Sequence, residues 1–321
     1  MKRKRDKQEF QYSTCANHSI GVLLLTKVPK LRVASGSFLA LIVLTFSAQS
    51  SSAGFQTKNF YNGEYTLVNC DVGQGDALVI RSKGEVAVID VGRESPAIDT
   101  CLSGLGISQI DLLVLTHFDM DHIGGVVGAV TGRSVSQALV TSSKDERPGA
   151  DFAKDYLEGL GIPMAQAEVG MTGELGNFSW QVLSPHLGAP EAKDTNDGSI
   201  SMVWQDDAIA LITLADLGES GQLRVGAEHS ALLSSGFGGR QVVVKVAHHG
   251  SGDQAPEFYE AIEPDVALVS VGLGNSYGHP TKRALGMLEL TGAQVFRTDQ
   301  SGAIGVTEGE NGLAISVSGR S

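Results

Sequence analysis

The densest group of chemically active side chains lies near the middle of the sequence. Two histidines and two aspartates occur within six consecutive residues: His117, Asp119, Asp121 and His122. The group follows the apolar run 111–116, a predicted β-strand, and precedes a Gly-Gly pair that opens a predicted helix. Imidazole nitrogens and carboxylate oxygens are common metal ligands, so this density at a strand end predicts a metal site. A solvated Asp-rich turn is the alternative, but it leaves the two flanking histidines unexplained.

Other candidate ligands also come directly after apolar runs that predict buried strands. They are Asp216 after residues 211–215, His248 and His249 after residues 242–247, and His279 beyond residues 266–271. An isolated Asp or His at a strand end more often caps a turn than binds a metal. Strand ends of one sheet layer converge in space, however. We therefore expect these residues to complete the site that begins at His117.

Short strands, helices and glycine-bearing turns alternate through the body of the chain. The pattern predicts strands at 65–70, 77–81, 86–90, 111–116, 178–183, 201–205, 208–214, 242–247, 266–271, 293–297, 303–307 and 313–317. It predicts helices at 96–104, 122–131, 150–160, 255–262 and 281–291. The first three strands predict a β-meander. With no internal repeat or long linker, the body is expected to form one mixed α/β domain.

These motifs resemble the metallo-β-lactamase superfamily, whose signature is His-x-His-x-Asp-His. The resemblance is closer to the extracytoplasmic hydrolase domain of ComEC-type DNA-uptake competence proteins and its stand-alone relatives, where Asp replaces the second His as Asp119 does. Shared motifs are Asp71-Val72-Gly73-Gln74-Gly75-Asp76-Ala77, Asp90-Val91-Gly92, His248-His249-Gly250-Ser251 and Tyr277-Gly278-His279-Pro280. The resemblance covers residues 64–317. It implies an αββα sandwich with a two-metal site at one edge.

The resemblance also implies roles for individual residues. It assigns His117, Asp119 and His248 to one divalent ion, Asp121, His122 and His279 to a second, and Asp216 to a position between them. Two zinc or manganese ions would lower the pKa of a water and supply hydroxide for hydrolysis. Asp121 is also counted among the catalytic residues, and His249 and Tyr277 are expected to orient the substrate or protonate the leaving group.

Other motif residues are candidates for the outer part of the site. We expect the glycine-rich turn to bring Asp76 and Gln74 toward it, while Asn196 and Ser199 either support it or form a plain Asx turn. One departure from the family pattern is Ala215, where these relatives usually have glycine before the shared Asp. The membrane channel that accompanies this domain in true competence proteins is also absent from the 321 residues.

The formal charge of −12 combines two unlike parts. Residues 1–53 hold eight basic and two acidic residues, and residues 54–321 hold 16 basic and 34 acidic residues. The basic start, the apolar run 38–46 and the small residues Ser51 and Ala53 are typical of an export signal cleaved after Ala53. An uncleaved membrane anchor is the alternative, although nine apolar residues are about half of a membrane span. We expect a hydrolase domain at 54–321 that is periplasmic or secreted.

The sequence leaves the substrate open. The motifs favour a phosphodiesterase or nuclease, whereas the acidic body disfavours a nucleic acid and leaves a lactone, another ester or a cell-envelope phosphoester as alternatives. A non-catalytic binding module is a third class, which the full set of metal-binding residue types argues against. Cys70 and Cys101 could pair in an oxidising compartment or remain buried thiols.

Overall fold

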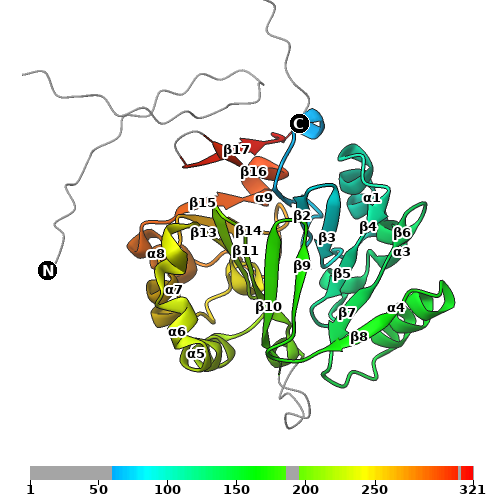
Figure 1. Cartoon of the computed structure of the whole chain (residues 1–321), viewed down its shortest axis with the longest axis horizontal. Helices are drawn as coiled ribbons and strands as arrows, with labels where there is room; N and C mark the ends of the chain where they lie inside the picture. The colour runs from blue at the N-terminus through cyan, green and yellow to red at the C-terminus, as the bar shows by residue number, and fades with distance from the viewer. Residues whose placement is uncertain (1–59, 186–194, 310–311, 321) are drawn as a thin grey trace, which may run out of the picture.

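Two β-sheets packed face to face form the centre of the molecule, and helices cover the outer face of each (Figure 1). The computed structural model describes residues 60–185, 195–309 and 312–320. The first sheet has the strand order β17-β16-β1-β2-β3-β5-β7-β8, and the second has the order β15-β14-β13-β12-β11-β10-β9. A two-stranded sheet of β4 and β6 lies apart from both. The predicted αββα sandwich is confirmed.

The strands and helices are numbered in order along the chain. The strands are β1 (Leu67–Asn69), β2 (Leu78–Ser82), β3 (Glu85–Ile89), β4 (Gln109–Ile110), β5 (Leu112–Leu115), β6 (Ser134–Val135), β7 (Ala138–Thr141), β8 (Met164–Ala167), β9 (Thr172–Leu175), β10 (Phe178–Ser184), β11 (Ser201–Gln205), β12 (Ile209–Thr213), β13 (Gln241–Lys245), β14 (Val266–Val269), β15 (Gln294–Arg297), β16 (Ile304–Gly309) and β17 (Gly312–Val317). The α-helices are α1 (Ser95–Gly104), α2 (Met120–Ile123), α3 (Val126–Val130), α4 (Pro148–Gly159), α5 (Glu219–Glu228), α6 (Ser230–Leu233), α7 (Pro256–Ile262), α8 (Lys282–Thr291) and α9 (Thr298–Ser301).

Each sheet changes from antiparallel to parallel pairing partway across. Strands β1, β2 and β3 form the predicted meander, after which β5, β7 and β8 continue in parallel. In the second sheet β12, β13, β14 and β15 are parallel. Parallel strands are joined by crossovers and end at the same edge of a sheet. The loops after β5, β12 and β13 therefore meet at one edge of the sandwich.

Three apolar layers hold the sandwich together. The central layer packs the inner faces of the sheets and includes Trp204 and Phe178, both essentially inaccessible to solvent. A second layer joins the first sheet to α1, α3 and α4, and a third joins the second sheet to α5, α7 and α8. Strands β5, β12 and β14 are buried along their whole length, as expected for strands covered on both faces.

The predicted helix 122–131 is instead two short helices, α2 and α3. The break falls at two closely packed glycines: a Cβ placed on Gly125 would lie 2.0 Å from the carbonyl oxygen of Val91, and one on Gly124 would lie 2.3 Å from that of Arg93. Glycine at both positions therefore allows the chain to pass close to the loop after β3 between α2 and α3. The sequence pattern did not predict β7, β8, β9 or α5, whose apolar runs are short or interrupted.

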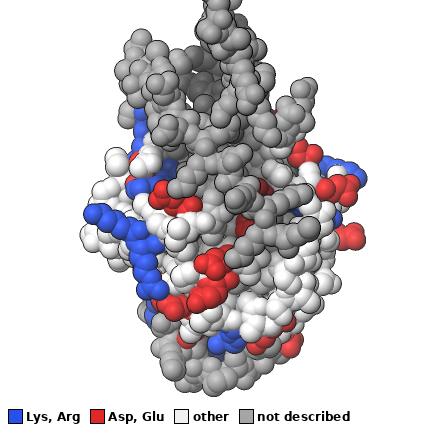
Figure 2. Space-filling view, turned by 90° about the vertical axis from the view of Figure 1, so that its left-hand side faces the viewer, with Lys and Arg blue, Asp and Glu red and all other residues white. Residues whose placement is uncertain are grey.

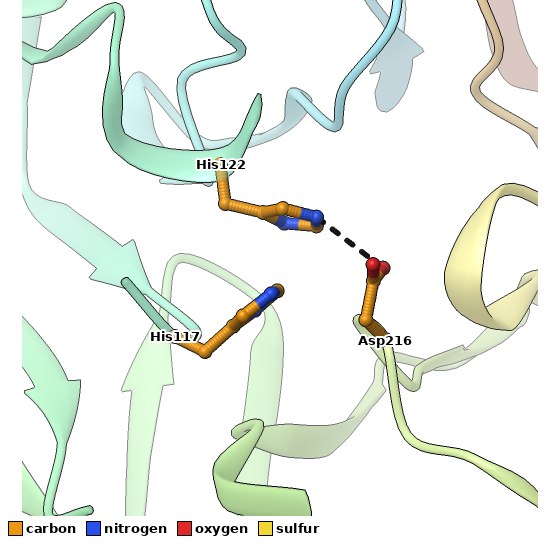
Figure 3. A group of neighbouring side chains, drawn as sticks. All are labelled: His117, His122 and Asp216. Atoms are coloured by element: carbon orange, nitrogen blue, oxygen red, sulfur yellow. Dashed lines mark ion pairs between the residues drawn. The ribbon is translucent and has the colours of Figure 1, made fainter. Parts of the chain in front are cut away.

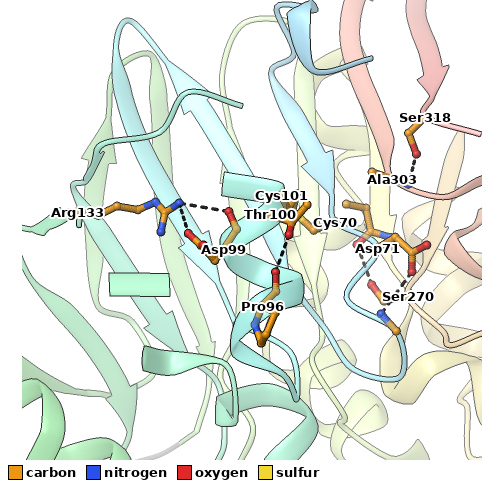
Figure 4. Close-up of a disulfide and its surroundings, with 12 residues drawn as sticks. Cys70, Asp71, Pro96, Asp99, Thr100, Cys101, Arg133, Ser270, Ala303 and Ser318 are labelled. Atoms are coloured by element: carbon orange, nitrogen blue, oxygen red, sulfur yellow. Dashed lines mark hydrogen bonds and ion pairs between the residues drawn. A yellow bond between two sulfur atoms is a disulfide. The ribbon is translucent and has the colours of Figure 1, made fainter. Parts of the chain in front are cut away.

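A disulfide joins Cys70, just after β1, to Cys101 in α1 (Figure 4). Both cysteines are buried in the layer that packs α1 on the first sheet, so of the two possibilities left open by the sequence, the structure contains the bonded pair. The expected export segment, residues 1–53, lies outside the described residues. Among the helices that the structure does describe, none is both long and apolar enough to span a bilayer.

Candidate metal centre

His122 is fixed in a buried network at the ends of β3 and β5. Its Nδ1 lies 2.8 Å from Oδ2 of Asp90, and Asp90 also accepts hydrogen bonds from the backbone N–H and the hydroxyl of Thr116. A carboxylate that accepts from Nδ1–H orients the ring and leaves the Nε2 lone pair available as a ligand. Burial opposes protonation of His122, but the carboxylates of Asp216 and Asp90 outweigh it and raise its pKa well above the usual value.

His249 is held in a similar way after β13. Its Nδ1 lies 3.0 Å from the carbonyl oxygen of Ser270 and 3.1 Å from Oδ1 of Asp76, so Nδ1 must carry the proton and Nε2 faces the site. Behind Asp76, the buried ammonium of Lys245 donates to Oδ2 at 2.6 Å. Burial lowers the pKa of His249, but nearby carboxylates, chiefly Asp216 and Asp76, raise it to about 10. These contacts place Asp76 beside the candidate cluster.

Asp216 lies at the centre of the cluster. Its Oδ1 is 3.3 Å from Nε2 of His122, and its Oδ2 is 3.5 Å from Nε2 of His249 (Figure 3 shows the first of these contacts). His117 lies beside His122, with 4.1 Å between the ring centroids, and its possible ligand atom is within 4.8 Å of those of His122 and Asp216. Asp121 completes the inner cluster, since its Oδ2 is 3.3 Å from Nε2 of His249.

Within the described residues, the possible ligand atoms form overlapping groups whose members lie within 4.8 Å of one another. Three of these groups are His117 with His122 and Asp216, Asp121 with His122 and His249, and Asp76 with Asp216 and His249. His122, Asp216 and His249 each belong to two of the three. This arrangement could hold two neighbouring cations with Asp216 between them.

Unpaired polar atoms show that a cation fits this cluster. The Nε2 atoms of His117, His122 and His249 and Oδ1 of Asp216 are buried, and none has a hydrogen-bond partner among the described residues. Buried polar atoms are nearly always satisfied, so several such atoms facing one another indicate an ion-binding position. The carboxylates also require a compensating positive charge. Although burial alone would raise the pKa of Asp216, the neighbouring histidines hold it well below its usual value.

The remaining predicted ligands surround this inner cluster. His248 is 29% exposed, and its Nε2 lies 3.8 Å from Oδ2 of Asp216. The His279 ring lies beside that of His248, at 5.6 Å between centroids, and the exposed ring of Tyr277 stacks on His279. Asp119 approaches Nε2 of His117 only to 3.9 Å. The geometry therefore places His249 nearer to the other ligands than His248, which the sequence analysis had favoured.

The two polar-turn candidates differ in their contacts. Ser199 is buried, and its hydroxyl accepts a hydrogen bond from the backbone N–H of Asp216 at 3.4 Å, so it supports the central residue. Asn196 begins the 3-10 turn Asn196–Gly198 and its carbonyl accepts from the N–H of Ser199, as in the plain-turn interpretation. Gln74 accepts from the N–H of Gly272 and so links the glycine-rich turn to the loop after β14.

Several site residues adopt left-handed backbone conformations, which are uncommon for residues other than glycine. Asp90, Ala215, His248 and His249 have φ values of 58°, 48°, 49° and 53°. Such conformations persist where the surroundings fix them, and they concentrate at functional sites. The φ value at Ala215 accounts for the glycine that the relatives usually have at this position, because glycine adopts this conformation without strain.

Sequence reasoning missed two residues that position the ligands, Asp90 and Lys245. Asp90 ends a predicted strand within a recognised motif, so its place at the strand end was the available signal. Lys245 interrupts the apolar run 242–247, and a lysine inside a buried strand indicates a buried partner.

Surface charge is mixed on the face that carries α5 to α8. Acidic side chains are interspersed with basic ones there, and no continuous basic stripe crosses the described part of this face (Figure 2). A protein that binds a long polyanion usually displays such a stripe. The described part of this face that Figure 2 shows therefore does not display the charge pattern expected of a nucleic-acid groove.

Comparison with known proteins is consistent with this geometry. Residues 70–216 match the metallo-beta-lactamase superfamily. The chain is 27% identical over 264 residues to ComE operon protein 3 of Bacillus subtilis (strain 168), covering 75% of this chain and 32% of that protein. It is 26% identical over 250 residues to competence protein ComA of Neisseria gonorrhoeae, covering 76% of this chain and 32% of that protein. The chain thus spans about a third of the length of these relatives.

Among solved structures, it resembles the metallo-beta-lactamase fold protein YhfI from Bacillus subtilis, with 10% identity, a TM-score of 0.48, and coverage of 73% of this chain and 96% of that one.

Proposed function

Since the chain contains a metallo-β-lactamase superfamily domain with ComEC-type motifs, we propose that it is a metal-dependent hydrolase acting on phosphodiesters. The observation that carries the proposal is the convergence of three buried, unpaired Nε2 atoms on the carboxylate of Asp216. Superfamily membership supports hydrolysis, and the competence-type motifs support a phosphodiester as the substrate.

In this proposal the inner cluster holds two divalent ions. His117, His122 and Asp216 would hold one, and Asp121, His249 and Asp216 the other, with Asp119, His248 and His279 completing the coordination from the outer side. When bound, zinc or manganese would supply Lewis acidity and lower the pKa of a water molecule.

The chain's own residues prepare this site. Asp90 and Asp76 keep the Nδ1 protons in place, so that the Nε2 lone pairs of His122 and His249 face inward. The left-handed backbone at His248 and His249 presents both rings toward Asp216 from one short loop. Tyr277, exposed at the rim, is placed to contact the leaving group of the substrate.

The experiment combines metal analysis with a panel of substrates. The full chain is assayed with manganese or zinc on bis-p-nitrophenyl phosphate, single-stranded DNA, a lactone and nitrocefin. We expect two metals per chain and turnover of a phosphodiester. Asp216→Ala should lose both metal and activity, whereas Asp207→Ala, at an exposed turn after β11, should lose neither. Activity on the lactone without any on phosphodiesters would favour the alternative substrate class.

We also propose that the protein is exported. The basic and apolar segment before residue 54 supports this, and so does the disulfide, because disulfides are rare in reducing compartments. Cell fractionation and sequencing of the mature N-terminus test the proposal. A cytosolic protein that begins at Met1 would contradict it.

A further inference from the structure

A pocket opens beside the metal centre, on the side of the first sheet. It has a volume of about 140 Å³, and its lining includes His117 and Phe118 from the loop after β5, Ser143 and Lys144 from the loop after β7, and Thr195. A water molecule needs only about 10–15 Å³ of such space, so the pocket has room for a group the size of a phosphate. Because His117 belongs to both the pocket and the ligand cluster, a substrate held at the metals would reach into the pocket.

The β7–α4 loop brings the ammonium of Lys144 and the carboxylate of Asp145 to this pocket. Lys144 is exposed, and its ammonium forms no hydrogen bond or ion pair with any residue that the structure describes. Arg147, at the end of the same loop, bonds to the lining residue Asp145 and to Asp119 through Nε and Nη2, while its Nη1 has no partner in the described parts of the chain. Lys154 lies behind, with its ammonium 5.2 Å from the ring centroid of Phe118.

Asp145, which lines the pocket, and Asp119 are both paired with Arg147. Both carboxylate oxygens of Asp145 accept from Arg147, and although burial alone would raise the pKa of Asp145, that guanidinium lowers it. Oδ1 of Asp119 accepts from Arg147 and from the hydroxyl of Thr195, at 2.7 and 2.8 Å. Asp119 therefore connects Arg147 and Thr195 to the loop that carries His117 and His122. The ammonium of Lys144 and Nη1 of Arg147 remain available to an anion.

We propose that this pocket binds a second phosphate group of the substrate, next to the scissile phosphodiester. The proposal rests on the proposed function and narrows the substrate class to phosphodiesters that carry an adjacent phosphate. Lys144 and Arg147 supply the charge, and the hydroxyl of Ser143 is a further donor. The loop after β7 then determines which phosphodiester is accepted, while the metal cluster carries out the hydrolysis.

The preference for a substrate with an adjacent phosphate can be tested with three dinucleotides that differ only in a terminal phosphate. They are thymidylyl-thymidine and its 5′- and 3′-phosphorylated forms, assayed with the full chain and its metals. Charge-assisted hydrogen bonds to one phosphate predict a kcat/KM roughly tenfold higher for at least one phosphorylated form. Lys144→Gln should remove most of the difference in kcat/KM between the phosphorylated and unphosphorylated dinucleotides. Lys83→Gln, on the β2–β3 turn, should preserve that difference. Equal rates on all three substrates, or a ratio unaffected by Lys144→Gln, would overturn the proposal.

A binding measurement separates this proposal from the proposed function. Calorimetric titration of the same proteins with inorganic phosphate should show affinity weakened roughly tenfold by Lys144→Gln and retained in Lys83→Gln. If phosphate binds in this Lys144-dependent way but no phosphodiester is cleaved, the pocket assignment stands and the proposed function fails. If phosphodiesters are cleaved and phosphate binding does not depend on Lys144, the pocket assignment fails alone.

Discussion

Removal of the Cys70–Cys101 disulfide should lower the free energy of unfolding substantially. The bond closes a loop with a sequence separation of 31 residues. For a loop of this length, the chain-entropy relation predicts a stabilisation of about 3.7 kcal/mol at 25 °C, because the cross-link restricts the unfolded chain. Total stabilities of domains are typically about 5–15 kcal/mol, so this single bond accounts for a large share.

Urea unfolding with and without a reductant measures this contribution. Both cysteines are buried, so the reductant must be present throughout the transition for the bond to open in the unfolded state. We expect a lower midpoint in dithiothreitol, together with a steeper dependence of the free energy on urea, because the reduced unfolded chain exposes more surface. Cys70→Ala/Cys101→Ala serves as the control, since its midpoint should not respond to dithiothreitol.

Two results would refute this reasoning. If thiol titration of the denatured, non-reduced protein finds both cysteines free, the bond is absent. If the bond is present but the midpoint does not move on reduction, the loop-entropy argument does not apply to this chain.

The remaining predictions concern positions where packing or charge leaves little freedom. Lys245→Met should lower the free energy of unfolding by about 3–5 kcal/mol, because it leaves the carboxylate of Asp76 buried without its partner. The double variant Lys245→Met/Asp76→Leu should recover part of the lost free energy of unfolding, as measured by urea unfolding. If the effects of the two changes simply add, Lys245 and Asp76 do not stabilise each other. Gly125→Ala should destabilise by about 1–3 kcal/mol, since its Cβ would lie 2.0 Å from the Val91 carbonyl oxygen. Gly159→Ala, at a helical position with no atom within 4 Å of the new Cβ, should instead raise the thermal midpoint slightly.

The residue types and strand ends were sufficient to predict most of the residues that the structure brings together in the candidate cluster. Asp216 and the residues of the loop after β5 follow apolar strands, and parallel strands necessarily end at one edge. The choice between His248 and His249 could not be made in this way, because adjacent residues share the same strand end. Both residues have a left-handed backbone, and the His249 ring is the one held in the buried position by contacts with Ser270 and Asp76, residues distant in the sequence.

The predicted elements succeeded where apolar runs were long and failed where close backbone contacts intervened. Strands β5, β12 and β13 were predicted because their residues are buried on both faces. The break between α2 and α3 has no periodicity signal, and it falls where Gly124 and Gly125 pack against the backbone of Arg93 and Val91, about 30 positions away in the chain. The disulfide likewise depends on the distance between β1 and α1, which a sequence pattern does not contain.

Net charge and local charge support different conclusions about the substrate. Residues 54–321 have 18 more acidic than basic residues, which argues against a long nucleic-acid groove. Charges separated by more than about 10 Å are largely screened at 0.1 M salt, so a small substrate responds mainly to groups at the site itself. There, Lys144 lines the pocket together with Asp145, and both Asp145 and Asp119 are paired with Arg147. The acidic surface is therefore compatible with a small phosphorylated substrate, and it excludes long polyanions more strongly than short ones.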